Sequence, residues 1–256
     1  MQSDTPKPRI ACAQTSSGLR RARMRPNPVF VALDTPDLER ALTLSRAVRS
    51  HVGGLKVGLE FITACGPDGV KRIVDIGLPV FADVKFHDIP NTVAAASREL
   101  ARLGAKMFNI HASGGEVMMR EAATAAHAID PDVKVLGVTV LTSIDDSLLN
   151  AVGQRGPAAE QVLRLAKLAK QSGLDGVVCS AHEIAPLREA CGDKFCLVVP
   201  GIRPAGANLD DQRRVMTPGE AYAAGADILV VGRPITSASD PATAARAIAA
   251  ELAGHG

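Results

Sequence analysis

The 256-residue chain is 46% hydrophobic but only 3% aromatic, and its 29 basic and 27 acidic residues give a net charge of +2. No basic stripe with interleaved aromatic residues occurs, which argues against a nucleic-acid-binding protein. No apolar run approaches the roughly 18 residues that a membrane span requires. The composition suits parallel strands buried under helices, in a chain long enough for one large α/β domain.

The ends and cysteines of the chain bear on its cellular compartment. The five cysteines form no C-x-x-C pair and no zinc spacing, so we expect free thiols, a reducing environment and a cytoplasmic protein. Residues 1–27 are polar and lack the hydrophobic segment of a secretion signal. We expect them to form a disordered extension; an organellar transit peptide and a true start at Met24 are the alternatives.

From Pro28 onward, short apolar runs alternate with longer segments of 3.6-residue periodicity. The expected strands are 29–33, 55–59, 78–81, 106–110, 133–140, 176–179, 195–199 and 228–231. The expected helices are 37–48, 61–75, 92–103, 116–129, 157–172, 182–190, 218–224 and 241–252. Eight strand–helix alternations without a break in composition predict one α/β domain over residues 28–256, a closed (β/α)8 TIM barrel; an open doubly wound sheet is the alternative.

Polar residues gather at the carboxyl ends of these expected strands, which is the end where a barrel carries its active site. This asymmetry indicates a functional site more strongly than any single residue does. The residues concerned are Asp34, Lys56, Asp83, Lys85, Asp88, His111, Thr142, Ser180, Arg203 and Arg233.

The most informative stretch is 81–93, which follows the third expected strand. Asp83 and Lys85 are two positions apart, so their side chains should leave the strand on one face, and Asp88 follows in a turn. A lysine between two carboxylates stays protonated, which suits a general acid beside a developing carbanion. Lys56, one strand earlier, would extend these charges into an alternating row.

Two other interpretations of the same stretch stay open. The charges could form a surface ladder of ion pairs, or Asp83 and Asp88 could bind a divalent ion with His87 or His111; Lys85 between the two acids argues against a metal. The next helix is expected to begin at an N-cap, Asn91 or Thr92.

The segments after the last two strands have the features of a phosphate site. Gly232 and Arg233 stand at a strand-to-helix junction, where backbone N–H groups favour an anion. Arg203 and Arg233 could add guanidinium donors. The segment 200–216, which contains Gln212, is long enough to fold over a ligand. The alternative is that both arginines are surface residues that cap helices.

Together these segments resemble the orotidine 5′-phosphate decarboxylase family, in order and over about 200 residues. The run D-x-K-x-x-D-I-P-N-T is the most specific of them. The segments are Val31-Ala-Leu-Asp34, Leu55-Lys-Val-Gly58, Phe81-Ala-Asp-Val-Lys-Phe-His-Asp-Ile-Pro-Asn-Thr92, Val138-Thr-Val-Leu-Thr-Ser143, Pro200-Gly-Ile-Arg203 with Asp211-Gln212, and Val230-Val-Gly-Arg233.

The resemblance implies conversion of orotidine 5′-monophosphate to uridine 5′-monophosphate in pyrimidine biosynthesis, with no metal or organic cofactor. It implies that Asp34 and Lys56 hold the ribose hydroxyls, that Asp83 lies against the substrate carboxylate, and that Lys85 protonates C6. It further implies that Thr142 contacts the pyrimidine.

For the phosphate, the resemblance implies Gln212, Gly232 and Arg233 as ligands, with Arg203 supporting the closing loop. It also implies a homodimer in which Asp88 and Thr92 reach the partner's site.

Two rival functions remain on the sequence alone. One is a related magnesium-dependent decarboxylase of a keto-sugar phosphate, which shares the D-x-K-x-x-D spacing. The other is a non-catalytic barrel that binds a sugar phosphate or nucleotide. Binding alone has no need of a lysine between two acids, so affinity without turnover would indicate the second rival.

Overall fold

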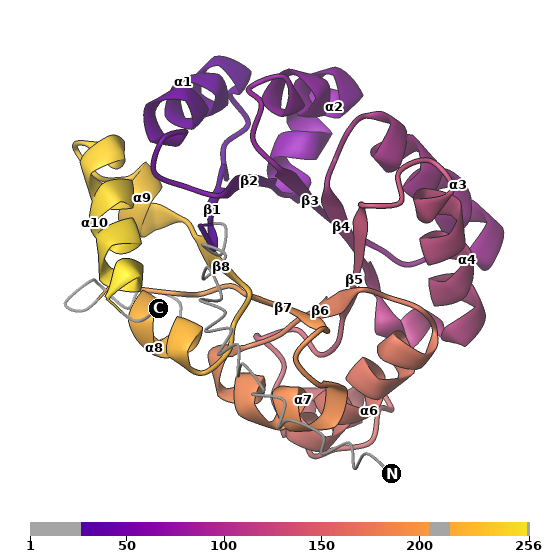
Figure 1. Cartoon of the computed structure of the whole chain (residues 1–256). Helices are drawn as coiled ribbons and strands as arrows, with labels where there is room; N and C mark the ends of the chain where they lie inside the picture. The colour runs from indigo at the N-terminus through magenta and orange to yellow at the C-terminus, as the bar shows by residue number, and fades with distance from the viewer. Residues whose placement is uncertain (1–26, 205–215, 255–256) are drawn as a thin grey trace, which may run out of the picture.

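The structure, a computed structural model, describes residues 27–204 and 216–254. Its eight strands are all parallel, and β1 pairs with β8 to close a barrel in the order β1 to β8. Figure 1 looks along the barrel, with the strands as an inner ring and the helices around it. The predicted (β/α)8 TIM barrel is confirmed. The strands are β1 (Val29–Ala32), β2 (Gly54–Val57), β3 (Val80–Phe86), β4 (Met107–His111), β5 (Lys134–Val138), β6 (Gly176–Val178), β7 (Cys196–Val199) and β8 (Ile228–Val231).

The helices follow the predicted pattern, with two short additions, α5 and α9, and two 3-10 turns that periodicity did not indicate. None of the helices in the described ranges is long and apolar enough to cross a membrane. The helices are α1 (Leu38–Val48), α2 (Leu59–Val74), α3 (Pro90–Arg102), α4 (Glu116–His127), α5 (Asp146–Ala151), α6 (Ala158–Gln171), α7 (Ile184–Cys191), α8 (Pro218–Ala223), α9 (Arg233–Thr236) and α10 (Pro241–Ala253), and the turns are η1 (Ala112–Gly114) and η2 (Ala181–Glu183).

The predicted extension 1–27 lies outside the described residues except for Asn27. That residue already belongs to the barrel, because its side-chain oxygen accepts a hydrogen bond from Val29 N at 3.0 Å and its amide donates to the His51 carbonyl at 2.7 Å.

Side chains alternate along each strand between the two faces of the barrel wall. On β1, Val29 and Val31 join the large apolar cluster between strands and helices, whereas Phe30 and Ala32 join a second, smaller cluster. This second cluster draws residues from six of the strands and fills the barrel interior. The members nearest the carboxyl ends of the strands, such as Ala32 and Val230, form an apolar floor there.

The third strand differs most from its predicted range, 78–81. It begins at Val80 and continues to Phe86, so Asp83 and Lys85 lie within β3 rather than beyond it. The expected helix cap is wrong as well, since Ile89 is the N-cap of α3 and Pro90 is its first residue. Proline is favoured at this first position because the helix needs no N–H there.

The connections at the amino-terminal end of the barrel, from helix to strand, are short turns. Gly104 follows α3 with a φ of 90° and Gly225 follows α8 with a φ of 108°. Such left-handed backbone favours glycine, which lets the chain turn sharply from helix into strand.

Candidate active site

A cavity of about 330 Å³ opens at the carboxyl ends of the strands. Its floor is the apolar interior of the barrel, and its walls carry most of the residues that were predicted from the sequence to form a functional site. Those in the lining are Asp34, Lys56, Asp83, Lys85, Thr142, Arg203, Gly232 and Arg233.

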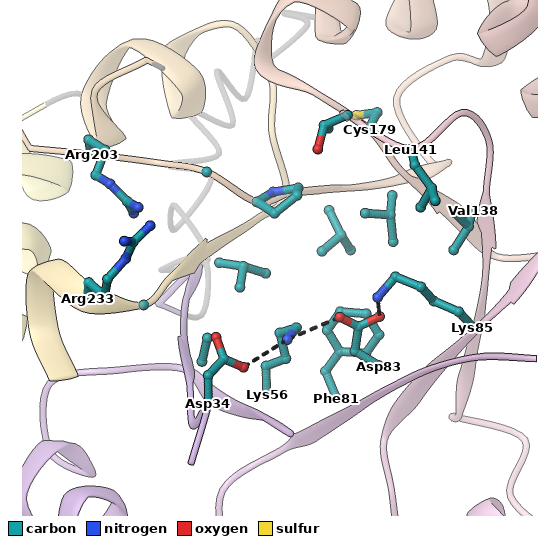
Figure 2. A pocket seen from close by; sticks show the side chains of 18 of the residues that line it. Asp34, Lys56, Phe81, Asp83, Lys85, Val138, Leu141, Cys179, Arg203 and Arg233 are labelled. Carbon is teal, nitrogen blue, oxygen red and sulfur yellow. Dashed lines mark hydrogen bonds and ion pairs between the residues drawn. The ribbon is translucent and has the colours of Figure 1, made fainter. Parts of the chain in front are cut away.

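One wall of the cavity is a row of alternating charges (Figure 2). Lys56 Nζ lies 3.5 Å from Asp34 Oδ1 and 3.1 Å from Asp83 Oδ2, and Lys85 Nζ contacts Asp83 Oδ1. The row therefore runs Asp34, Lys56, Asp83, Lys85, with each charge beside its opposite. Figure 2 shows Lys85 at the end of the row away from Asp34.

Asp83 is the centre of this row and the most enclosed of its carboxylates, with 8% of the residue exposed. Burial alone would raise the pKa of Asp83. The charges of Lys56 and Lys85, with hydrogen bonds from Lys85 and Asn109, outweigh burial and hold that pKa below its ordinary value. Asp83 is therefore an anion at neutral pH.

Asn109 on β4 is a site residue that the sequence reasoning missed. Its amide Nδ2 donates to Asp83 Oδ1 at 2.7 Å, and its Oδ1 accepts from Lys85 N at 2.8 Å. The available signal was an amide between two large apolar residues of one strand, Phe108 and Ile110, since a buried polar group needs partners.

A second part of the wall, on the side of Asp34 because β8 pairs with β1, carries positive charge. Figure 2 shows the guanidinium groups of Arg203, which follows β7, and Arg233, which follows β8, pointing toward one another at one side of the cavity. Arg203 is 7% exposed, and its Nε has no hydrogen-bond partner among the described residues. Two converging cations and a buried unsatisfied donor suit an anionic ligand. Gly232 N-caps α9 beside them.

Two of the residues to which the resemblance gives a role are described by the structure but do not line the cavity. Asp88 and Thr92 are exposed, on the chain that leaves β3 and enters α3. Within the described residues, Asp88 makes no ion pair with Lys85; its carboxylate accepts from Ile89 N at 2.6 Å. Gln212 lies outside the described residues.

Two histidines flank the outer end of the charged row. The rings of His87 and His111 lie 5.4 Å apart between centroids. Burial, followed by the charges of His87 and Lys85, lowers the pKa of His111, so its ring is neutral at pH 7. Among the described residues no group of three His, Cys, Asp or Glu side chains is arranged to hold a metal ion.

Among the residues that the structure describes, the rest of the lining gives no activated nucleophile. Cys179 borders the cavity after β6, but burial raises the pKa of its thiol well above the ordinary value. A protonated thiol is a poor nucleophile. The features left for chemistry in the described cavity are the charged row and the two arginines.

A parallel barrel with alternating charges on one wall of an apolar cavity and two converging arginines on the other defines an enzyme for an anionic, phosphate-bearing substrate. The chain matches the family described as Orotidine 5'-phosphate decarboxylase / HUMPS over residues 27–248. It belongs to that family.

Individual relatives agree with this assignment. The orotidine 5'-phosphate decarboxylase of Paramagnetospirillum magneticum is 51% identical over 88% of this chain and 98% of its own length. That of Moorella thermoacetica is 54% identical over 88% and 91%. The crystal structure of orotidine 5'-phosphate decarboxylase from Lactobacillus acidophilus has a TM-score of 0.79 and 43% identity, covering 88% of this chain and 99% of that one.

Proposed function

We propose that the chain is a carbon–carbon lyase that converts orotidine 5′-monophosphate to uridine 5′-monophosphate and carbon dioxide in pyrimidine biosynthesis. The observation that carries the proposal is the pairing of two features in one cavity. A row of fixed charges ends in Lys85 on one wall, and Arg203 and Arg233 converge on the other. The first suits decarboxylation and the second suits a phosphate. Membership of the family supports both assignments.

The chemical step needs stabilisation of a carbanion. When the bond between C6 and the carboxyl carbon breaks, its electron pair stays on C6 and carbon dioxide leaves. That carbanion has no adjacent electron sink, so a preplaced ammonium stabilises it more than the delocalised carboxylate before it. Lys85 then donates an N–H proton to C6, and the resulting amine takes a proton back from water.

Asp83 and its neighbours prepare Lys85 for this step. The carboxylate of Asp83 is shared between Lys85 and Lys56, which holds the ends of both side chains in place. Lys56 and Asp34, at the near end of the row, are positioned as ligands for the ribose hydroxyls. Thr142, exposed at the rim after β5, would contact the pyrimidine.

The phosphate lies, in this proposal, between the two arginines. Each guanidinium can donate two parallel hydrogen bonds to phosphate oxygens, and the backbone at Gly232 supplies a further donor. Gln212 would join them from the segment after β7. Binding energy from the phosphate, which takes no part in the bond that breaks, organises the site for the chemical step.

We also propose a homodimer in which Asp88 and Thr92 complete the partner's site. Support comes from their exposure near Ile89, an apolar side chain that is 66% exposed, and from Val117, 59% exposed on α4, the helix that packs against α3. Exposed apolar groups of this size suit a protein interface. The charged row of this chain also lacks the second carboxylate that the resemblance implies beside Lys85. The free thiols of the described cysteines fit a cytoplasmic enzyme.

A complementation experiment tests the shared site. Lys85→Ala and Asp88→Ala proteins are each expected to have very low turnover. Mixed dimers should regain part of the wild-type activity, because one of their two sites then has an intact Lys85 and an intact Asp88. No recovery in verified mixed dimers would show that Asp88 does not act across the interface.

The proposed reaction is tested by following the ultraviolet absorbance of orotidine 5′-monophosphate with the purified chain and excess chelator. Turnover under these conditions supports the proposal and excludes the magnesium-dependent rival. Decarboxylation of a keto-sugar phosphate that stops on chelation would favour that rival. Tight binding of uridine 5′-monophosphate by a folded protein without turnover would favour the binding barrel.

A further inference from the structure

One side chain outside the cavity lining connects the two most important residues of the charged row. Asn109 stands on β4, 1% exposed, in register with the apolar side chains that fill the barrel interior. Its amide group has two ends, and each contacts a different residue of β3. The NH2 donates to the Asp83 carboxylate at 2.7 Å, and the oxygen accepts the Lys85 backbone N–H at 2.8 Å. Reversing the amide would break both bonds, so its orientation is fixed.

The second bond holds an irregular piece of backbone. Between Ala82 and Phe86, β3 advances four residues while its partner strand β4 advances two, from Phe108 to Ile110. Within this bulge Lys85 has a φ of 50°, the one positive φ at a non-glycine residue in the described chain. Side chains disfavour that conformation, so the surrounding structure must hold it. The Asn109 oxygen takes the Lys85 N–H that a regular ladder would have paired.

The first bond fixes the plane of the Asp83 carboxylate. One oxygen of that group accepts from both Lys85 Nζ and Asn109 Nδ2, and the other faces Lys56 at 3.1 Å. The lysine donors sit on flexible stems, whereas Asn109 is enclosed in the barrel wall. Its amide is therefore the rigid reference for the carboxylate and, through the carboxylate, for the Lys85 ammonium.

We propose that Asn109 is a positioning residue for the decarboxylation, setting the direction of the Lys85 side chain through the bulge and of the Asp83 carboxylate through its amide. This inference rests on the proposed function. Asn109 does not line the cavity, so it acts through Asp83 and Lys85 rather than on the substrate.

Two variants separate the two bonds. Asn109→Leu keeps the same branching and number of side-chain heavy atoms and removes both. Asn109→Asp keeps an oxygen for the Lys85 N–H but replaces the donor to Asp83 with a second carboxylate. Because a misplacement of about 1 Å can cost roughly 100-fold in rate, we expect Asn109→Leu to lower kcat about 100-fold with KM within a few-fold of wild type.

The pH dependence of kcat in Asn109→Asp tests the positioning role, because a purely structural role of Asn109 would leave this dependence unchanged. Two carboxylates in contact share a proton, which raises one pKa. Below that pKa the shared proton restores a hydrogen bond to Asp83, and above it the two anions repel. We expect kcat to fall as pH rises through a new ionisation that the wild type lacks.

The matched control is Asp175→Ala at the other end of the barrel. Asp175 Oδ2 likewise accepts a strand N–H, from Val135 at 2.8 Å, and contacts His127 Nε2 at 3.1 Å. This variant should lose stability while keeping the wild-type kcat and pH profile.

The outcomes distinguish a failure of the proposed function from a failure of the positioning role. A wild-type chain without turnover contradicts the proposed function. Wild-type turnover with kcat within threefold in the Asn109 variants, and no new ionisation in Asn109→Asp, overturns the positioning role alone. If Asn109→Leu does not fold, the nearly isosteric Asn109→Asp decides by its kcat and pH profile.

Discussion

The two ends of the barrel use aspartate in different ways. At the amino-terminal end, Asp175 and Asp227 each accept the backbone N–H of the neighbouring strand at 2.8 Å, from Val135 and Leu197. Each also contacts a side chain from the surrounding helices, His127 or Arg188. At the carboxyl end, by contrast, every polar partner of Asp83 is a side chain, and two of those partners reach into a cavity.

This contrast shows what distinguishes a structural carboxylate from a chemical one. An aspartate bound to strand backbone fixes the wall of the barrel, whereas Asp83 fixes the positions of two ammonium groups. Cavity size does not make the distinction, because a hollow of about 420 Å³ at the amino-terminal end exceeds the 330 Å³ of the candidate site. What distinguishes the candidate site is its charges, because opposite charges converge on one wall and like charges on the other.

The largest effect is expected for Lys85→Ala. Removing the ammonium deletes both the charge that stabilises the carbanion and the proton donor, so kcat should fall by at least about 10⁴-fold. Steady-state turnover of orotidine 5′-monophosphate measures the loss, with circular dichroism to verify the fold. A kcat within tenfold of wild type would contradict the proton-donor role.

The arginines should affect binding more than the chemical step. Arg233→Ala and Arg203→Ala each remove charge-assisted hydrogen bonds of about 1.5–3 kcal/mol, so KM should rise roughly 10- to 100-fold. Arg246→Ala is the matched control, because Arg246 is an exposed arginine on α10. An unchanged KM in both site variants would count against the phosphate assignment.

At the other end of the barrel, Asp227→Ala should change stability and not catalysis. The variant leaves Leu197 N without its side-chain acceptor and Arg188 without its carboxylate, at a cost of about 1–3 kcal/mol in the free energy of unfolding. Urea denaturation measures this loss. A kcat reduced more than threefold in folded protein would break the distinction between the two ends.

The smallest expected effect is a pH dependence of stability. Because the folded pKa of Asp83 is lowered, its ionisation stabilises the fold above the unfolded pKa of about 3.9. That contribution is lost as pH falls from about 3.9 through the folded value. The free energy of unfolding of Asp83→Asn should therefore fall less steeply than that of wild type in this acid range. Parallel curves would show that Asp83 is not held as an anion by its neighbours.

Much of the fold was predictable from the sequence. The alternation of apolar strands with periodic helices determines a barrel because each element must bury one face, and the polar residues at strand ends located the site. Lys56 and Asp83, which are far apart in sequence, could be placed together because their strands are neighbours.

The missed features depend on contacts across the sheet. The bulge in β3 and the role of Asn109 follow from the register of β3 against β4, which periodicity within one strand does not encode. The error in the predicted helix cap had a local cause. Asn91 and Thr92 are residue types that often cap helices, but Pro90 is already the first residue of α3. Helices as short as α9 carry too few residues for a periodic signal.

The glycine turns at 103–106 and 224–227 have a consequence for circular permutation. They lie at the end of the barrel away from the cavity, and both connect a helix to the next strand. The described chain also starts and stops at this end, with β1 leaving it and α10 returning to it. New termini placed in either turn, with the old ones joined by a linker, would leave every cavity-bearing connection between strand and helix uncut. The order of the eight units along the gene is thus separable from the geometry of the site.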